Sequence, residues 1–159
     1  MRLFSFTLLL ALVCSAHADG STRPNIILFV TDDQSPIAGC YGSPDIKTPH
    51  LDSLAAEGTR FTNAFATTAS CSASRSVILS GLHNHCNGQY GHTHAFHKFS
   101  TFPSVAAVSL PLQMKQAGYR TARIGKYHVA PVSVFEFEHR LPGNARNARL
   151  MAENCRELF

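Results

Sequence analysis

The amino-acid sequence predicts an α/β protein, a three-layer sandwich with helices on both faces of a mostly parallel central sheet. Residues 24–30 form a continuous apolar run of branched and aromatic side chains, the pattern of a strand that is buried on both faces. Helix signals followed by a strand pattern occupy residues 48–65, and the same order returns over residues 109–124. Because this α-then-β order repeats, helices on both faces of one sheet are the expected arrangement.

The first expected strand ends in two adjacent carboxylates, Asp32 and Asp33. Open α/β sheets place their ligands beyond the carboxyl ends of the strands, so the pair is a candidate ligand site. Two adjacent aspartates are, however, more often simple turn residues. The pair alone therefore does not decide between a turn and a site.

Residues 48–58 carry complete signals for both ends of a helix. Thr48 can cap the helix, Pro49 suits its first position and Gly58 can terminate it. The expected buried stripe comprises Leu51, Leu54 and Ala55.

Shorter patterns predict the remaining elements. Residues 59–65 alternate in the manner of a strand, with Phe61, Asn63 and Phe65 on one side. Residues 109–118 predict a helix with an early proline and a terminal glycine, and residues 119–124 predict the strand after it. The signals then weaken: residues 135–139 fit a strand or an extended loop, and residues 144–159 are compatible with a helix.

A candidate reactive segment begins at Cys71, after a loop of small polar residues. A short helix is expected from Ser74 to a stop at Gly81, so Cys71 would lie just ahead of a helix N-terminus, where backbone N–H groups favour negative charge. Arg75 lies one turn away and can point back at the same spot, where its guanidinium suits an oxyanion. The alternative is an inert thiol beside a solvated arginine, and residue chemistry alone favours that alternative.

Two further groups of basic side chains are candidates. Lys126 and His128 follow the strand expected over residues 119–124 and would share one face if the backbone stays extended. Either residue alone could equally be a solvent-exposed surface residue. A histidine-rich stretch could hold zinc, although such histidines are more often scattered hydrogen-bonding residues of a loop. Its members are His83, His85, His92, His94 and His97.

Composition and the N-terminus limit the class of protein. The formal net charge is +4 without a run of Lys or Arg, which argues against nucleic-acid binding. Residues 1–18 have the charged end, apolar run and small-residue cleavage site of a signal peptide, too short to span a bilayer. The mature chain, 19–159, is therefore expected to be soluble and to enter an oxidising compartment, where disulfides can form. Its cysteines are Cys40, Cys71, Cys86 and Cys155.

Several of these motifs occur together in one family. The pattern Cys-x-Ala-x-Arg at 71–75, followed by Leu-x-Gly, resembles the signature of the type I sulfatases, whose usual form is Cys-x-Pro-x-Arg. The pattern Gly-Lys-x-His at 125–128 resembles a further sulfatase motif, and the resemblance spans residues 24 to about 131. It implies an alkaline-phosphatase-like fold. Residues 81–99 are similar to the heparan N-sulfatase (sulfamidase) branch.

The resemblance also implies a mechanism. A formylglycine-generating enzyme would oxidise Cys71 to formylglycine in the endoplasmic reticulum, and the hydrated aldehyde would attack the sulfur of a sulfated glycosaminoglycan or amino sugar. One Ca²⁺ would be held partly by Asp32, Asp33 and the residue at position 71. Arg75 would hold the nucleophile, Lys126 would contact the sulfate, and His128 would take a proton.

The resemblance further implies that the chain is the N-terminal part of a lysosomal or secreted sulfatase. In that family the later half adds an Asp-Asn pair to the calcium site, and no Asp follows Asp52 here. We therefore expect residues 19–159 to be a truncated catalytic domain without turnover of its own, and a homodimer only when full length. The rival interpretations are a sulfated-glycan-binding module, a histidine-based zinc protein and a phosphoryl-transfer relative of the same fold.

Overall fold

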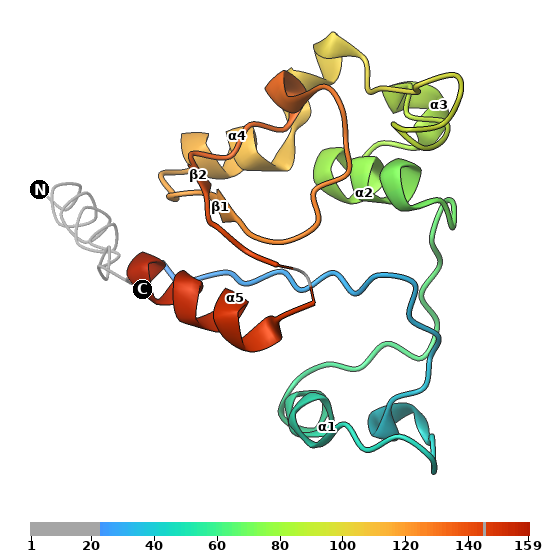
Figure 1. Cartoon of the computed structure of the whole chain (residues 1–159), viewed down its shortest axis with the longest axis vertical. Helices are drawn as coiled ribbons and strands as arrows, with labels where there is room; N and C mark the ends of the chain where they lie inside the picture. Colours follow the sequence, from blue (N-terminus) through green and yellow to red (C-terminus); the bar gives the residue numbers. More distant parts are fainter. Residues whose placement is uncertain (1–22, 145) are drawn as a thin grey trace, which may run out of the picture. The chain divides into compact units, whose positions relative to one another are not determined.

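The computed structural model describes residues 23–144 and 146–159 (Figure 1), so the expected signal peptide lies outside the described residues. The chain divides into two units, residues 1–31 and 32–159. The second unit contains all of the described helices and strands. In chain order they are the 3₁₀ helix η1 (Gly39–Tyr41), α1 (Pro49–Glu57), α2 (Cys71–Ser80), α3 (Asn84–Asn87), η2 (Pro103–Val108), α4 (Leu110–Gln116), β1 (Ala122–Arg123), η3 (Val132–Val134), β2 (His139–Arg140), α5 (Ala148–Cys155) and η4 (Arg156–Leu158).

The expected first strand is absent: the described residues of the first unit have no regular secondary structure. Within this run the side chains of Ile26 and Phe29 are 63% and 84% exposed. A strand that is buried on both faces needs hydrogen-bonded neighbours and covering helices. The described residues provide no strand that pairs with this run, so its prediction as a buried strand is wrong for this structure.

Helix α1 forms where its end signals place it, but its expected stripe is not buried. Leu51 is 40% exposed and Leu54 is 65% exposed. The side chain of Thr48 does not cap the helix; its Oγ1 donates to Asp52 Oδ1 at 2.9 Å and accepts from the Gly39 amide at 2.9 Å. These bonds attach η1 to α1. The strand expected over residues 59–65 is also absent, because no described strand pairs with it.

The described sheet consists of two short parallel strands. Ala122 of β1 pairs with His139 of β2, and Arg123 pairs with Arg140. Strand β1 follows α4 as predicted, although it covers two residues rather than six. At the C-terminal end, α5 forms within the helix-compatible region, and Asn147 Oδ1 caps it by accepting from the Leu150 amide at 3.0 Å.

A small apolar core lies under the chain that follows β1. It consists of Val105, Val129, Val134 and Phe135, which are at most 5% exposed, with Leu79, Leu82, Ala106 and Tyr127 packed against it. Tyr127 belongs to the loop 124–131, and its hydroxyl donates to the Phe135 carbonyl oxygen at 2.6 Å. The core therefore fixes this loop beside helix α2, to which Leu79 belongs.

A buried polar network joins α2 to the chain after α3. The Asn87 side-chain amide donates to Ser76 Oγ at 3.0 Å, to Ser80 Oγ at 3.3 Å and to the Leu82 carbonyl oxygen at 3.2 Å. The Gln89 side-chain amide donates to two carbonyl oxygens further along the chain. Because both side chains are fully buried, these bonds satisfy polar groups that water cannot reach. They hold the loop 88–101 against α2.

No helix among the described residues is both long enough and apolar enough to cross a bilayer.

Candidate active site at the start of helix α2

Cys71 is the first residue of α2, so the helix begins three residues earlier than the sequence predicted. Ser70, in extended conformation, precedes it, and Gly81 ends the helix in the left-handed region with its amide bonded to the Val77 carbonyl oxygen. Cys71 is half-buried and lies beside free N–H groups of the first helical turn. This end of α2 is a favourable location for negative charge.

Arg75 connects α2 with two segments that are distant in sequence. Its guanidinium donates to the Lys126 carbonyl oxygen at 3.0 Å and to Asp32 Oδ1 at 3.3 Å. The side chain is only 12% exposed. Arg75 therefore contacts both Asp32 and the loop of Lys126.

Lys126 binds the same carboxylate as Arg75. Its Nζ lies 2.9 Å from Asp32 Oδ1 and 2.8 Å from Oδ2. The hydrogen bond to Asp32 raises the pKa of Lys126, with smaller contributions from the Asp32 charge and from Cys71. The hydrogen bond from Lys126 likewise is the main cause that lowers the pKa of Asp32. Both groups are therefore charged at neutral pH.

His128 belongs to a loop in which it and Gly125 have left-handed backbone conformations, so the backbone is not extended here as assumed from the sequence. Strand β1 ends at Arg123, and the φ angles of Gly125 and His128 are 78° and 55°. The imidazole packs in a stack with His92 and His94, and its Nε2 lies 2.8 Å from His94 Nδ1. Burial, followed by the charge of Lys126, lowers the pKa of His128, so the ring is neutral at neutral pH.

Three side chains offer ligand atoms to one point. One atom each from Cys71, His92 and His128 lies within 4.8 Å of the other two, and all three residues are half-buried. Nδ1 of His92 and Nδ1 of His128 are buried and have no hydrogen-bond partner among the described residues. The other members of the histidine-rich stretch, His83, His85 and His97, are not part of this group.

Asp33 is not part of the group formed by Cys71, His92 and His128. Its backbone is left-handed, with φ 55°, its side chain is exposed, and we find no hydrogen bond or ion pair of its carboxylate in the described part of the chain. Calcium usually takes six to eight oxygen ligands. Since Asp32 is bound by Lys126 and Arg75 and Asp33 faces solvent, the described residues do not assemble a calcium site by themselves.

Some residues that position the site carried no recognisable signal in the sequence. Ser72 is fully buried, and its Oγ accepts from the Thr93 amide at 3.2 Å, which ties the chain between His92 and His94 to α2. The Asn84 side-chain amide donates to the Ala73 carbonyl oxygen at 3.0 Å. Serine and asparagine are common throughout the sequence, so their role in holding the site together is recognised only when their long-range hydrogen-bond partners are known.

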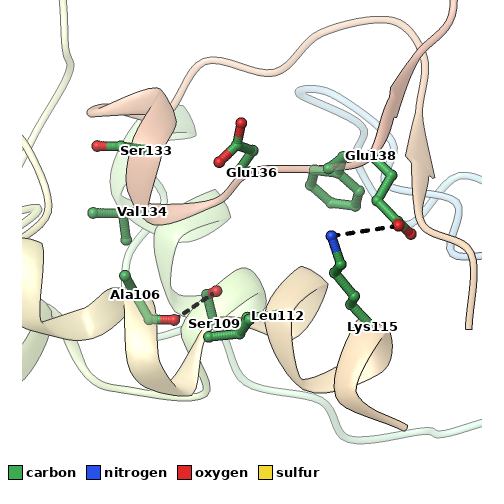
Figure 2. A pocket seen from close by; sticks show the side chains of 9 residues that line it. Ala106, Ser109, Leu112, Lys115, Ser133, Val134, Glu136 and Glu138 are labelled. Carbon is green, nitrogen blue, oxygen red and sulfur yellow. Dashed lines mark hydrogen bonds and ion pairs between the residues drawn. The ribbon is translucent and has the colours of Figure 1, made fainter. Parts of the chain in front are cut away.

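A separate cavity of about 320 Å³ lies away from these residues (Figure 2). Residues of α4, η3 and the chain before β2 line it, and Lys115 forms an ion pair of 3.5 Å with Glu138 at its edge. None of the six site residues predicted from the sequence lines this cavity. It therefore plays no part in the chemistry considered below.

Comparison with known proteins gives a consistent result. The family model described as Sulfatase matches residues 24–157. The human protein named N-sulphoglucosamine sulphohydrolase is 46% identical over 117 residues, which are 73% of this chain and 23% of the human protein. A Bacteroides thetaiotaomicron protein named N-acetylglucosamine-6-O-sulfatase is 40% identical over 122 residues, 76% of this chain and 20% of that protein.

A solved structure from work on glycosaminoglycan metabolism by Bacteroides thetaiotaomicron matches with a TM-score of 0.46 at 25% identity. The match covers 66% of this chain and 25% of that one. The chain thus spans about a quarter of the length of these proteins.

Proposed function

Because the chain belongs to the sulfatase family, we propose that the whole protein hydrolyses sulfate groups of sugars, and in particular the N-linked sulfate of glucosamine in heparan sulfate. The observation that carries the proposal is the location of Cys71 at the first position of α2, within reach of Lys126 and His128. The human relative at 46% identity, whose name specifies N-sulphoglucosamine, supports the choice of substrate. The resemblance recognised in the motifs is confirmed at the level of the family.

The proposal includes conversion of Cys71 to formylglycine by the formylglycine-generating enzyme. The hydrated aldehyde supplies two hydroxyl groups on one carbon, one to attack sulfur and one whose deprotonation releases sulfate, whereas a thiol has no second hydroxyl. The remaining chemistry belongs to the side chains around position 71. An exported sulfatase of this kind would act in the lysosome or outside the cell.

Two cations would bind and orient the sulfate. The raised pKa of Lys126 keeps its ammonium charged, and the side chain is close enough to Cys71 for that residue to contribute to the shift. A sulfate oxygen can replace one of the two Asp32 contacts, so that Lys126 is shared between Asp32 and the substrate. Arg75, fixed by the Lys126 carbonyl oxygen and by Asp32, would hold the oxygen atoms at position 71. Such fixed positive charge stabilises the negative charge that develops during transfer.

His128 would accept the proton. Its lowered pKa makes the ring neutral and therefore basic at neutral pH. His94, 2.8 Å from Nε2, holds the ring so that its Nδ1 remains available. A general base needs both this protonation state and this freedom to accept a proton.

Calcium is the cofactor that the family resemblance implies, with Asp32, Asp33 and the residue at position 71 as ligands. The described residues do not fit it alone, since one carboxylate is bound to two cations and the other faces solvent. Further oxygen ligands from outside the described residues would be required.

The test measures the chemical state of residue 71 and the rate of sulfate release. The whole protein is produced through a eukaryotic secretory route, and the peptide that contains residue 71 is examined by mass spectrometry. We expect an aldehyde at residue 71 and faster sulfate release from N-sulfoglucosamine than from glucosamine 6-sulfate. Cys71→Ala should abolish release, whereas the control Cys86→Ala, at an exposed cysteine, should leave it unchanged.

Three other outcomes would contradict parts of the proposal. A residue 71 found only as thiol or disulfide would remove the catalytic role of formylglycine. Binding of sulfated sugars without sulfate release would favour the glycan-binding interpretation. Preference for glucosamine 6-sulfate would assign the protein to another branch of the family.

A further inference from the structure

The group formed by Cys71, His92 and His128 offers the ligand chemistry of a zinc site rather than a calcium site. Their ligand atoms lie within 4.8 Å of one another. Thiolate and imidazole are the ligands that borderline-soft metals prefer, whereas calcium takes oxygen ligands. The three residues come from the start of α2, the loop after α3 and the loop after β1, so only the folded chain assembles them.

Two of the three ligand residues have ring nitrogens that lack a partner. Nδ1 of His92 and Nδ1 of His128 are buried and form no hydrogen bond with any described residue. A buried polar atom without a partner is unfavourable, and such an atom in a native structure calls for an explanation. A metal ion bound by Cys71 and by these two nitrogens would satisfy both of them at once.

One of the three proposed ligands, His128, also has an outer partner for its second ring nitrogen. A ligating histidine commonly uses its other ring nitrogen to bind an outer partner, which fixes the ring. Nε2 of His128 has such a partner in His94 Nδ1, at 2.8 Å, which leaves Nδ1 of His128 for a metal. Ser72 Oγ accepts from the Thr93 amide at 3.2 Å, which fixes the backbone next to His92 but does not bind its ring.

We propose that, while residue 71 is still a cysteine, Cys71, His92 and His128 bind one zinc-like divalent cation, with water as the fourth ligand. In tetrahedral zinc sites the ligand atoms are about 3.3–3.8 Å apart, so atoms that lie within 4.8 Å of one another need to approach by at most about 1.5 Å on binding. The Cys71 thiol releases one proton to solvent as it becomes the thiolate ligand. Asp32 neutralises part of the charge of Lys126 and Arg75 beside the site, which reduces their repulsion of the metal.

The site is distinct in chemistry from the proposed calcium centre and does not depend on the proposed conversion. Oxidation of Cys71 to an aldehyde removes the sulfur ligand, so the zinc-binding state and the converted state exclude each other. Metal bound at the thiol would therefore mark protein in which the conversion has not taken place.

The test uses Co²⁺ and Zn²⁺ alone as probes. The full chain is produced in a host that leaves residue 71 as a thiol, which peptide mass spectrometry verifies, and is titrated with Co²⁺ under reducing conditions. We expect one equivalent to bind, with a thiolate-to-cobalt charge-transfer band and the visible bands of tetrahedral cobalt. An excess of Zn²⁺ should displace the cobalt, and an excess of Ca²⁺ should not.

Matched variants assign the ligands. Cys71→Ser and His128→Ala should abolish the charge-transfer band, and His92→Ala should weaken binding by roughly tenfold or more. His94→Ala, at the outer partner of His128, should weaken it by about tenfold. The controls Cys86→Ser and His97→Ala lie outside the group and should bind as the parent does. Circular dichroism verifies that each variant is folded.

Three results would overturn the proposal. The first is absence of the charge-transfer band in the folded parent chain. The second is a band that survives Cys71→Ser, and the third is one that disappears in Cys86→Ser. Each of these leaves the proposed conversion of Cys71 untouched, because that conversion is read from the mass of the secreted protein.

Discussion

The ammonium of Lys126 lies within 2.9 Å of both carboxylate oxygens of Asp32, a residue 94 positions earlier in the chain. This pair, joined by Arg75, holds the first residues of the second unit against the loop after β1. The pair connects two candidate site residues before any ligand is present. Because both groups are charged, the contribution of the pair to the free energy of unfolding depends on pH.

Asp32→Asn should therefore lower stability only over a limited pH range. The folded-state pKa of Asp32 lies below 3.8, so its contribution is present above that value and is lost as the pH falls through the folded pKa. The folded-state pKa of Lys126 lies above 10.5, so its contribution is present below that value and is lost as the pH rises through the folded pKa. Urea unfolding should show a lower midpoint for the variant near neutral pH and equal midpoints in strong acid. Asp45→Asn, at an exposed aspartate, is the control, and an equal effect of both variants would contradict the prediction.

Lys126→Met should raise the pKa of His128 toward its ordinary value of 6.5. After burial, the charge of Lys126 is the largest cause of the lowered pKa, so its removal favours the imidazolium. The ring C–H shifts of His128, followed by NMR as a function of pH, measure the change. The control Lys47→Met removes an exposed charge that is not among the causes of the shift. A lower pKa in Lys126→Met would be inconsistent with this electrostatic account.

Tyr127→Phe should cost about 1–2 kcal/mol of unfolding free energy, because the Phe135 carbonyl oxygen loses its 2.6 Å donor while partly buried. Tyr127 lies between Lys126 and His128, so the variant should also speed hydrogen exchange of their amides. Tyr90→Phe is the matched control, since Tyr90 is 53% exposed and its bond to the His85 carbonyl oxygen is 3.5 Å long. Equal losses in the two variants would show that the loop is not anchored in this way.

Alanine substitutions at two glycines, Gly42 and Gly88, distinguish the energetic cost of backbone strain from that of crowding. Gly42 and Gly88 both have φ 86°, where an added side chain costs about 1–2 kcal/mol. A Cβ at Gly42 would meet nothing within 4 Å, whereas one at Gly88 would lie 2.8 Å from the Phe102 ring. Gly88→Ala should therefore be more destabilising than Gly42→Ala by about 1–3 kcal/mol in urea unfolding. Equal losses would mean that the ring moves aside freely.

Local signals were sufficient to predict three of the helices, α1, α2 and α4. The α/β class is confirmed by the family and by the parallel pairing of β1 with β2. Helices α1, α2 and α4 lie at the predicted places, because a cap, an early proline or a terminal glycine acts within a few residues. The strands expected over residues 24–30 and 59–65 did not form, because a strand depends on partners that are distant in sequence.

The candidate site was predictable only in part. The motifs identified Cys71 and Arg75 as well as Lys126 and His128, and the structure brings these segments together. The proximity of His92 to Cys71 could not be predicted from the spacing of these residues in the sequence. It depends on Ser72 and on the buried amides, which have no signature until their partners are known.

The buried Asn87-Gly88 step at the end of α3 has a consequence for the chemical ageing of the protein. Asn-Gly is the dipeptide most prone to deamidation, because the glycine nitrogen can attack the asparagine side chain to form a succinimide. Here Asn87 uses its amide in three hydrogen bonds, and the Gly88 nitrogen donates to the Asn84 carbonyl oxygen at 2.8 Å. The attacking nitrogen and the side-chain amide of Asn87 are thus both engaged in hydrogen bonds. The fold therefore slows succinimide formation at Asn87, because the hydrogen bonds around Asn87 and Gly88 must open before the reaction can take place.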